Sequence, residues 1–195
     1  MSRLDLEYAG SAEHPAEYPR WAAPEIAIAG RSNAGKSSLL NSIARSRNLA
    51  RVSKTPGRTQ RLHFFLAERA GFALVDLPGY GFARVSKDDR RRFASAVEAY
   101  LTERPNLRAI LLVIDVRRGL EDDERLLRDF AASRGVELLA VATKIDKLGR
   151  AERARRLGDL DRSGLGSWLP FSATTDEGRD AVIAALARVA GRRSA

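Results

Sequence analysis

Short apolar runs alternate with segments of helical spacing along most of the chain from residue 25 onward. Apolar runs that are bounded by Gly, Pro or polar turn residues are typical of buried strands. They predict six strands, at residues 26–29, 62–67, 72–75, 109–114, 136–142 and 169–172. The run from Ala109 to Ile114 is almost wholly apolar, which is expected of a central parallel strand covered on both faces.

Helical spacing of apolar residues predicts helices between and after these strands, beginning with residues 36–44. The side chains expected to face the core are Leu39, Leu40, Ile43, Phe93, Val97, Tyr100, Leu101, Leu126, Leu127, Phe130, Val182, Ile183, Leu186 and Val189. A further helix, which is strongly basic, is predicted at residues 150–160. Capping boxes are predicted where Ser86 precedes Asp89 and where Thr174 precedes Glu177.

Strands that alternate with helices indicate an α/β fold in three layers, with a mostly parallel six-stranded sheet and helices on both of its faces. In such a sheet, ligands bind beyond the carboxyl ends of the strands. Residues 1–22 contain Pro15 and Pro19 and show little periodicity, so we expect a mostly extended N-terminal arm. Residues 23–195 are expected to form a single domain, as the length of 195 residues suggests.

Composition narrows the class of protein. A content of 44% hydrophobic and 30% charged residues indicates a folded, soluble protein. The chain has no cysteine, and its two histidines, His14 and His63, stand alone, so no thiolate or histidine metal site is expected. No apolar run approaches the roughly 20 residues of a membrane span, and residues 1–14 lack the apolar segment of a signal peptide. A cytoplasmic protein without a membrane partner is therefore expected.

The net charge of +9 favours a polyanionic partner, and nucleic acid comes first among these. A solvated, arginine-rich surface without such a partner is the alternative that charge leaves open.

Residues 30–38, GRSNAGKSS, fit the pattern G-x-x-x-x-G-K-[ST] of a phosphate-binding loop. Glycines at both ends let the backbone wrap tightly, so that several N–H groups point at one anion. The helix that begins near Gly35 adds the positive end of its dipole. Lys36 is expected to reach the β and γ phosphates, and the Ser37 hydroxyl to bind Mg²⁺.

A second motif, Asp76-Leu77-Pro78-Gly79, follows an apolar strand directly. A carboxylate at that strand end is suited to hold Mg²⁺, usually through water. Gly79 lets its backbone N–H approach a γ-phosphate closely.

The identity of the nucleotide base is indicated by a third motif, Thr143-Lys144-Ile145-Asp146, which follows another buried strand. A guanine edge offers two donors, N1–H and the N2 amine, and the Asp146 carboxylate is able to accept both. Adenine lacks the amine and would leave that charge unpaired. The aliphatic stem of Lys144 is suited to lie against the base, and Ser172-Ala173 is placed to offer a backbone N–H to guanine O6.

These motifs, together with GRSNAGKSSL, KTPGRTQ, DLPGYGFARV and TKIDK, resemble those of the EngB family of bacterial ribosome-biogenesis GTPases, which are translation-factor-type P-loop GTPases. The resemblance spans about residues 20–190. It implies binding of GTP and GDP, Mg²⁺-dependent hydrolysis of GTP to GDP and phosphate, and a switch role in assembling the large ribosomal subunit and in normal cell division. The implied partners are the precursor of that subunit and its rRNA. We expect a monomer that does not bind DNA.

The residues expected to contact nucleotide are Gly30, Arg31, Ser32, Asn33, Ala34, Gly35, Lys36, Ser37, Ser38, Gly57, Arg58, Thr59, Gln60, Arg61, Asp76, Leu77, Pro78, Gly79, Thr143, Lys144, Ile145, Asp146, Phe171, Ser172 and Ala173. The family resemblance assigns Thr59 to the first switch, where its hydroxyl completes a Mg²⁺ shell with Ser37 and, through water, Asp76. Catalysis is assigned to Lys36, Thr59 and Gly79.

The chain departs from the broad GTPase pattern at two positions. Asn is usual where Thr143 stands, and the shorter threonine predicts modest affinity, while guanine selectivity is expected from Asp146. Tyr80 occupies the place of the glutamine that orients water in many GTPases, so intrinsic hydrolysis is expected to be slow. Related GTPases with an asparagine at the place of Asn33 use K⁺ for charge stabilisation, which makes Asn33 a candidate potassium ligand.

The basic residues after the second switch are candidates for contact with RNA phosphate: Arg84, Lys87, Arg90, Arg91 and Arg92. A solvated helix face is the other interpretation of this run. Two alternative functions stay open, a small-molecule kinase built on the same loop and an RNA-binding assembly factor with a vestigial nucleotide site.

Overall fold

The computed structural model describes residues 3–46, 49–50, 61–79 and 87–191, except for the side chains of residues 87–94. Its strands are β1 (Glu7–Ala12), β2 (Glu25–Ala29), β3 (Leu62–Ala67), β4 (Phe72–Asp76), β5 (Leu107–Asp115), β6 (Glu137–Thr143) and β7 (Trp168–Pro170). Its α-helices are α1 (Lys36–Ala44), α2 (Lys87–Glu103), α3 (Asp122–Ser133), α4 (Arg150–Asp161) and α5 (Arg179–Ala190).

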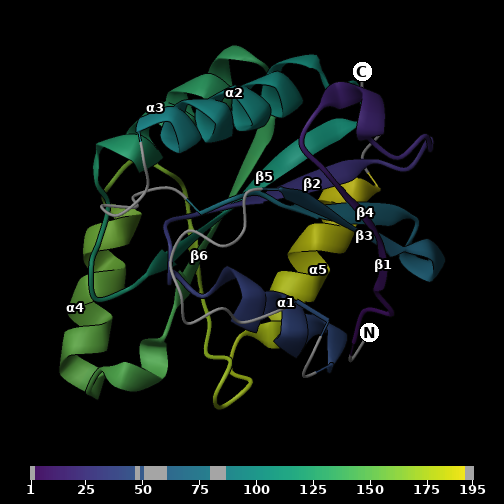
Figure 1. The fold of residues 1–195 in the computed structure, drawn as a ribbon. Coiled ribbons are helices and arrows are strands. Elements are labelled where there is room, and N and C mark those ends of the chain that lie inside the picture. Colours follow the sequence, from purple (N-terminus) through teal and green to yellow (C-terminus); the bar gives the residue numbers. More distant parts are fainter. Residues whose placement is uncertain (1–2, 47–48, 51–60, 80–86, 192–195) are drawn as a thin grey trace.

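The strands form one sheet in the order β1-β3-β4-β2-β5-β6-β7. Neighbouring strands from β4 through β2, β5 and β6 to β7 run parallel, and β3 pairs antiparallel with both β1 and β4. Helices α1 and α5 cover one face and α2 and α3 cover the other (Figure 1). The three-layer α/β fold predicted from the sequence is therefore confirmed.

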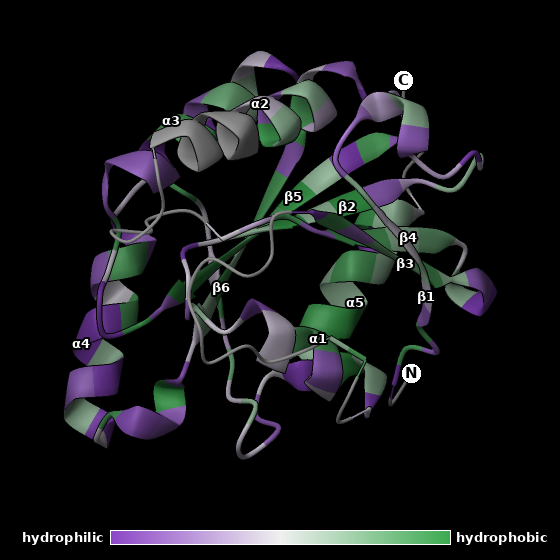
Figure 2. Ribbon diagram, in the orientation of Figure 1, coloured by the Kyte–Doolittle hydropathy of each residue, from purple (hydrophilic) through white to green (hydrophobic). Residues whose placement is uncertain are grey.

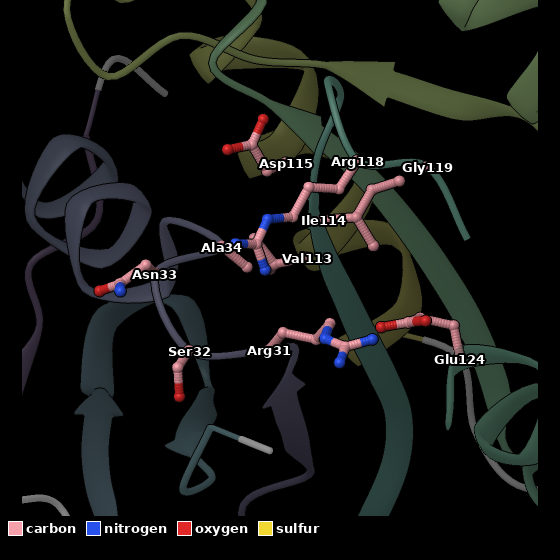
Figure 3. A pocket seen from close by; sticks show the side chains of 10 residues that line it. All are labelled: Arg31, Ser32, Asn33, Ala34, Val113, Ile114, Asp115, Arg118, Gly119 and Glu124. Carbon is pink, nitrogen blue, oxygen red and sulfur yellow. The ribbon is translucent and has the colours of Figure 1, made fainter. Parts of the chain in front are cut away.

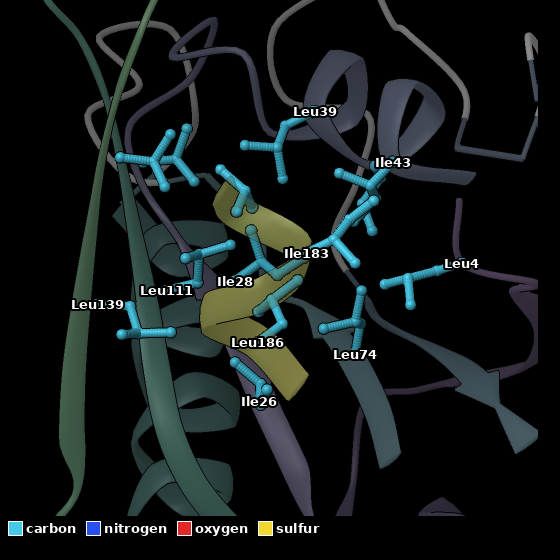
Figure 4. Packing of buried hydrophobic residues seen from close by; sticks show 14 of the residues in the cluster. Leu4, Ile26, Ile28, Leu39, Ile43, Leu74, Leu111, Leu139, Ile183 and Leu186 are labelled. Carbon is cyan, nitrogen blue, oxygen red and sulfur yellow. The ribbon is translucent and has the colours of Figure 1, made fainter. Parts of the chain in front are cut away.

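Successive side chains at residues 26–29 of β2 point to opposite faces of the sheet, and both sets are apolar, so both faces must be covered. Ile26 and Ile28 pack with Leu39 and Leu186 beneath α1 and α5 (Figure 4), whereas alanines at 27 and 29 face the cluster under α2. All five residues of β2 are buried. Apolar colouring accordingly follows the central strands, while polar residues dominate α4 (Figure 2). None of the described helices is both long and apolar enough to cross a membrane.

Within the described residues the sheet holds seven strands, one more than the six predicted. The additional strand, β1, lies within the segment expected as an extended arm, and Leu4 just before it is 1% exposed and donates its N–H to the Ile43 carbonyl at 2.9 Å. Strand β1 joins the sheet at its edge by pairing with β3, and its residues, EYAGSA, lack the apolar run that marks a buried strand. The register also shifts between Tyr8 and Gly10.

Two local predictions about helices are wrong. Leu126 was expected to face inward but is 67% exposed, because the buried face of α3 follows the 3.6-residue spacing through Glu124, Leu127 and Ala131. Thr174 does not cap the last helix: α5 begins after Gly178, whose φ is 80°. A Cβ at Gly178 would lie 1.9 Å from the Pro170 carbonyl oxygen, so the turn needs glycine there.

Candidate nucleotide-binding site

The motifs predicted from the sequence meet at one edge of the sheet. The phosphate loop joins β2 to α1, Asp76 ends β4, Thr143 ends β6, and Ser172 follows β7. Because these strands are parallel, their carboxyl ends share that edge, where ligands bind in sheets of this kind.

Glycine at position 30 lets the phosphate loop press against β5. A Cβ there would lie 2.2 Å from the Val113 carbonyl oxygen, and φ is 156°. Asn33 and Gly35 also have positive φ, of 63° and 105°, and α1 begins at the next residue, Lys36. The loop therefore wraps directly into a helix N-terminus, an arrangement that favours anions.

Lys36 crosses beneath this loop, and its Nζ donates to the Gly30 carbonyl oxygen at 3.1 Å. Burial lowers the pKa of Lys36, and the Asp76 carboxylate opposes that shift. A Cβ at Gly79 would lie 2.9 Å from Lys36 Nζ and 3.1 Å from the backbone nitrogen of Ser32. The segment from Asp76 to Gly79 thus lies against the phosphate loop.

Asp76 has the chemistry of a metal ligand. It is 7% exposed, and burial raises its pKa to about 6 although Lys36 acts in the opposite direction. Its Oδ1 is buried and accepts no hydrogen bond from the described residues. A buried carboxylate oxygen without a donor is costly unless something occupies it, and Mg²⁺ prefers oxygen ligands. Asp76 and the Ser37 hydroxyl, in the first turn of α1, therefore fit Mg²⁺.

The second half of the site centres on Asp146. Its Oδ1 accepts a hydrogen bond from Ser172 Oγ at 2.7 Å, and Lys147 Nζ lies 3.3 Å from Oδ2. Burial raises the pKa of Asp146, but the bonds from Ser172 and Lys147 outweigh burial, and the net shift is downward. The carboxylate is therefore ionised near pH 7, with its orientation fixed from one side.

Thr143 faces the phosphate loop. Its Oγ1 lies 2.5 Å from the Ala34 carbonyl oxygen and 2.8 Å from that of Ile114. A Cβ at Gly35 would lie 3.3 Å from the same hydroxyl. A threonine at this position ties β6 to the loop, and the loop passes close above it.

Lys144 is anchored at both ends. Its backbone is left-handed, with φ of 61°, and its Nζ donates to the Asn33 carbonyl oxygen at 2.6 Å. Its Nζ also lies 3.1 Å from Oδ2 of Asp115, a residue outside the predicted motifs. The signal in the sequence that would have found it is a carboxylate directly after the almost wholly apolar run from Ala109 to Ile114.

A small cleft lies on the β5 side of the phosphate loop (Figure 3). Arg31 pairs with Glu121, the N-cap residue of α3, and extends toward Glu124 across this cleft. The cleft is lined by Arg31, Ser32, Asn33, Ala34, Val113, Ile114, Asp115, Arg118, Gly119 and Glu124.

The side chains of two other predicted contacts, Arg61 and Phe171, are engaged elsewhere, and further predicted contacts lie outside the described residues. Arg61 pairs with Glu13 at 2.7 Å, beside β1. Phe171 is 1% exposed, and its side chain packs in the core beneath α5. Gly57, Arg58, Thr59 and Gln60, as well as Tyr80 and Arg84, lie outside the described residues, and nothing is described of the side chains of Lys87 and Arg90–Arg92.

A phosphate loop between a strand and a helix, combined with carboxylates at two further strand ends, defines the class of P-loop GTPases. The family model described as "50S ribosome-binding GTPase" matches residues 25–144, which is more than half of the chain. The chain belongs to the EngB family of GTP-binding proteins. It is 44% identical over 198 residues to "Probable GTP-binding protein EngB" of Anaeromyxobacter sp. (strain K), with 96% of this chain and 92% of that protein covered.

Solved structures agree with this assignment. A crystal structure named "probable GTP-binding protein engB" has a TM-score of 0.70 and covers 87% of this chain and 100% of that one, at 20% identity, which shows the shared fold. NFeoB from S. thermophilus bound to GDP·AlF4⁻ and K⁺ has a TM-score of 0.63 and 26% identity over 85% of this chain and 62% of that one.

Proposed function

We propose that the protein binds and slowly hydrolyses GTP with Mg²⁺, and that its nucleotide state switches its contact with precursors of the large ribosomal subunit and their rRNA in the cytoplasm. A role in normal cell division and growth would follow from that assembly step. The observation that carries the guanine assignment is the ionised Asp146 carboxylate, held by Ser172 at 2.7 Å. The "50S ribosome-binding GTPase" description of the matching family supports the ribosomal partner, as does the net charge of +9.

Base recognition combines three groups. Asp146 accepts N1–H and the N2 amine of guanine, and the stem of Lys144 covers one face of the base. The Ser172 N–H already donates to the Glu177 carbonyl oxygen at 3.0 Å. Ala173 follows directly and is an exposed residue, so its N–H is the donor that we assign to guanine O6.

Phosphate binding and hydrolysis use the other half of the site. Backbone N–H groups of the phosphate loop and Lys36 bind the β and γ phosphates, and the Gly79 N–H contacts the γ-phosphate. Ser37 and, through water, Asp76 hold Mg²⁺, which when bound neutralises charge on the phosphates. Thr59 completes that shell in the GTP state. With Tyr80 at the place of a water-orienting glutamine, turnover stays low until a partner or ion assists.

Potassium is the ion that we propose for this assistance, with Asn33 as a ligand. The Asn33 side chain is exposed at the mouth of the loop, and the K⁺ in the NFeoB structure supports the idea. We expect faster hydrolysis in KCl than in NaCl, and Asn33→Ala to abolish the difference. Equal rates of GTP hydrolysis in the two salts would show that potassium does not assist the reaction.

Cosedimentation with large-subunit precursors tests the switch. We expect binding with a non-hydrolysable GTP analogue and release with GDP, with a steep dependence on salt. Equal binding in both states would favour a constitutive RNA-binding factor with a vestigial site. Transfer of phosphate to a small acceptor would favour a kinase. Reversing the charges of Arg90–Arg92 tests the RNA surface, since unchanged association would exclude that helix.

A further inference from the structure

Asp115 occupies the position between the two halves of the nucleotide site. It is the last residue of β5, the strand that lies between β2, which leads into the phosphate loop, and β6, which leads into Lys144. It stands opposite Thr143 in the parallel register and is 5% exposed. A buried carboxylate needs charged or hydrogen-bonding partners. The partners of the Asp115 carboxylate indicate what this residue does.

Arg117 fixes the orientation of this carboxylate. Its Nε donates to Oδ1 of Asp115 at 2.9 Å and its Nη2 to Oδ2 at 2.6 Å, while the Arg117 backbone N–H donates to Oδ1 at 3.1 Å. A bidentate guanidinium with an added main-chain donor leaves the carboxylate little freedom to rotate. Burial raises the pKa of Asp115, but these bonds and Lys144 outweigh it and lower the pKa to about 2.

The remaining partner of the carboxylate is the ammonium of Lys144, at 3.1 Å from Oδ2. The same ammonium donates to the Asn33 carbonyl oxygen in the phosphate loop at 2.6 Å. With its backbone held in a left-handed conformation at φ of 61°, Lys144 is stretched from the end of β6 to the loop. Without Asp115, one main-chain carbonyl alone would hold that flexible side chain, whose rotamers are costly to order.

We propose that Asp115 is a positioning residue for guanine nucleotides, which acts by holding the stem of Lys144 as a preformed platform for the face of the base. This inference rests on the guanine site proposed above. Asp146 selects the base by its edge, whereas Asp115 acts through Lys144 and strengthens binding before any ligand arrives. Arg117, whose side chain is 47% exposed, supports the platform from the surface.

The test is a double-mutant cycle on nucleotide affinity, measured with GDP and with ADP. We expect Asp115→Asn to weaken GDP binding about tenfold, within the range found for contacting residues. We expect the same substitution to add less than about twofold in a Lys144→Ala background, because the residue acts through that lysine. Asp129→Asn is the matched control, since its exposed carboxylate pairs with Arg128 on α3.

Arg117→Ala serves as a second variant should Asp115→Asn fail to fold, as judged by thermal melting. It should weaken GDP binding by a smaller factor, and again only when Lys144 is present. Additive losses, or full affinity in Asp115→Asn, would overturn the role of Asp115 while leaving the preference for GDP over ADP intact. Equal affinity of the wild-type protein for GDP and ADP would instead overturn the guanine site, and the guanine role of Asp115 with it.

Discussion

Lowering the pH from 7 to 5 should weaken Mg²⁺ binding to the GDP complex, because Asp76 must be ionised to serve as a ligand. Its pKa is raised to about 6 by burial. The ionised fraction therefore falls from about nine-tenths at pH 7 to about one-tenth at pH 5, and metal affinity falls about tenfold. Phosphates of a bound nucleotide add negative charge near the carboxylate and raise the pKa further, so tenfold is a lower bound.

The assay is the Mg²⁺ concentration that half-maximally slows release of a fluorescent GDP, measured at pH 5, 6, 7 and 8. Nucleotide phosphates also titrate, so Asp76→Asn provides the control that retains their contribution without the carboxylate. We expect a weaker Mg²⁺ response in Asp76→Asn at pH 7 and 8, a difference that shrinks toward pH 5, and therefore a shallower pH dependence. Parallel profiles for the two proteins would refute the assignment of Asp76 as a metal ligand with a raised pKa.

Three further substitutions test separate parts of the structure. Gly79→Ala places a Cβ 2.9 Å from Lys36 Nζ and 3.1 Å from the Ser32 nitrogen and should weaken binding of a GTP analogue about tenfold in equilibrium titrations, the size of one lost charge-assisted hydrogen bond. Because Lys36 and Ser32 belong to the phosphate loop, GDP binding should weaken as well, by a smaller factor. Unchanged affinity for the GTP analogue would contradict a γ-phosphate contact at Gly79. Arg104→Ala leaves Glu25, which is 0% exposed, without its guanidinium partner and should lower the free energy of unfolding by about 3–5 kcal/mol in urea. A loss under about 1 kcal/mol would mean that Trp21 and Tyr100, the other donors to Glu25, suffice. Asp146→Asn exchanges a hydrogen-bond acceptor for a donor. It should shift the binding preference from GDP to xanthosine diphosphate in competition assays, because xanthine carries an oxygen in place of the N2 amine of guanine. An unchanged preference for GDP would mean that Asp146 does not contact the base.

Helices and strands whose own residues show a clear apolar periodicity, bounded by turn residues, are predicted well from the sequence. Helix α1 and strand β3 are predicted to the residue, at Lys36–Ala44 and Leu62–Ala67. In α1 the glycine of the phosphate loop marks the start, and in β3 turn residues bound the apolar run. The motif residues of the site are likewise found at strand ends, because an abrupt change from apolar to polar residues marks such ends.

Features that depend on distant partners are not visible in a local pattern. Strand β1 is held by pairing with β3, and its own residues show only a partial apolar alternation. Thr143 hydrogen-bonds to Ala34, 109 residues away in the chain. Its contact with the phosphate loop therefore cannot be predicted from the four-residue motif. The role of Asp115 depends in the same way on which strands the fold sets side by side.

Isothermal titration calorimetry of the wild-type protein with GDP and with ADP is a direct test of guanine recognition by Asp146. Adenine has neither the N1–H nor the N2 amine of guanine, so it would not donate the two hydrogen bonds that Asp146 is expected to accept, and sites built on such bonds discriminate strongly. We predict that GDP binds at least about a hundredfold more tightly than ADP. Binding of the two nucleotides within about threefold of each other would contradict guanine recognition by Asp146.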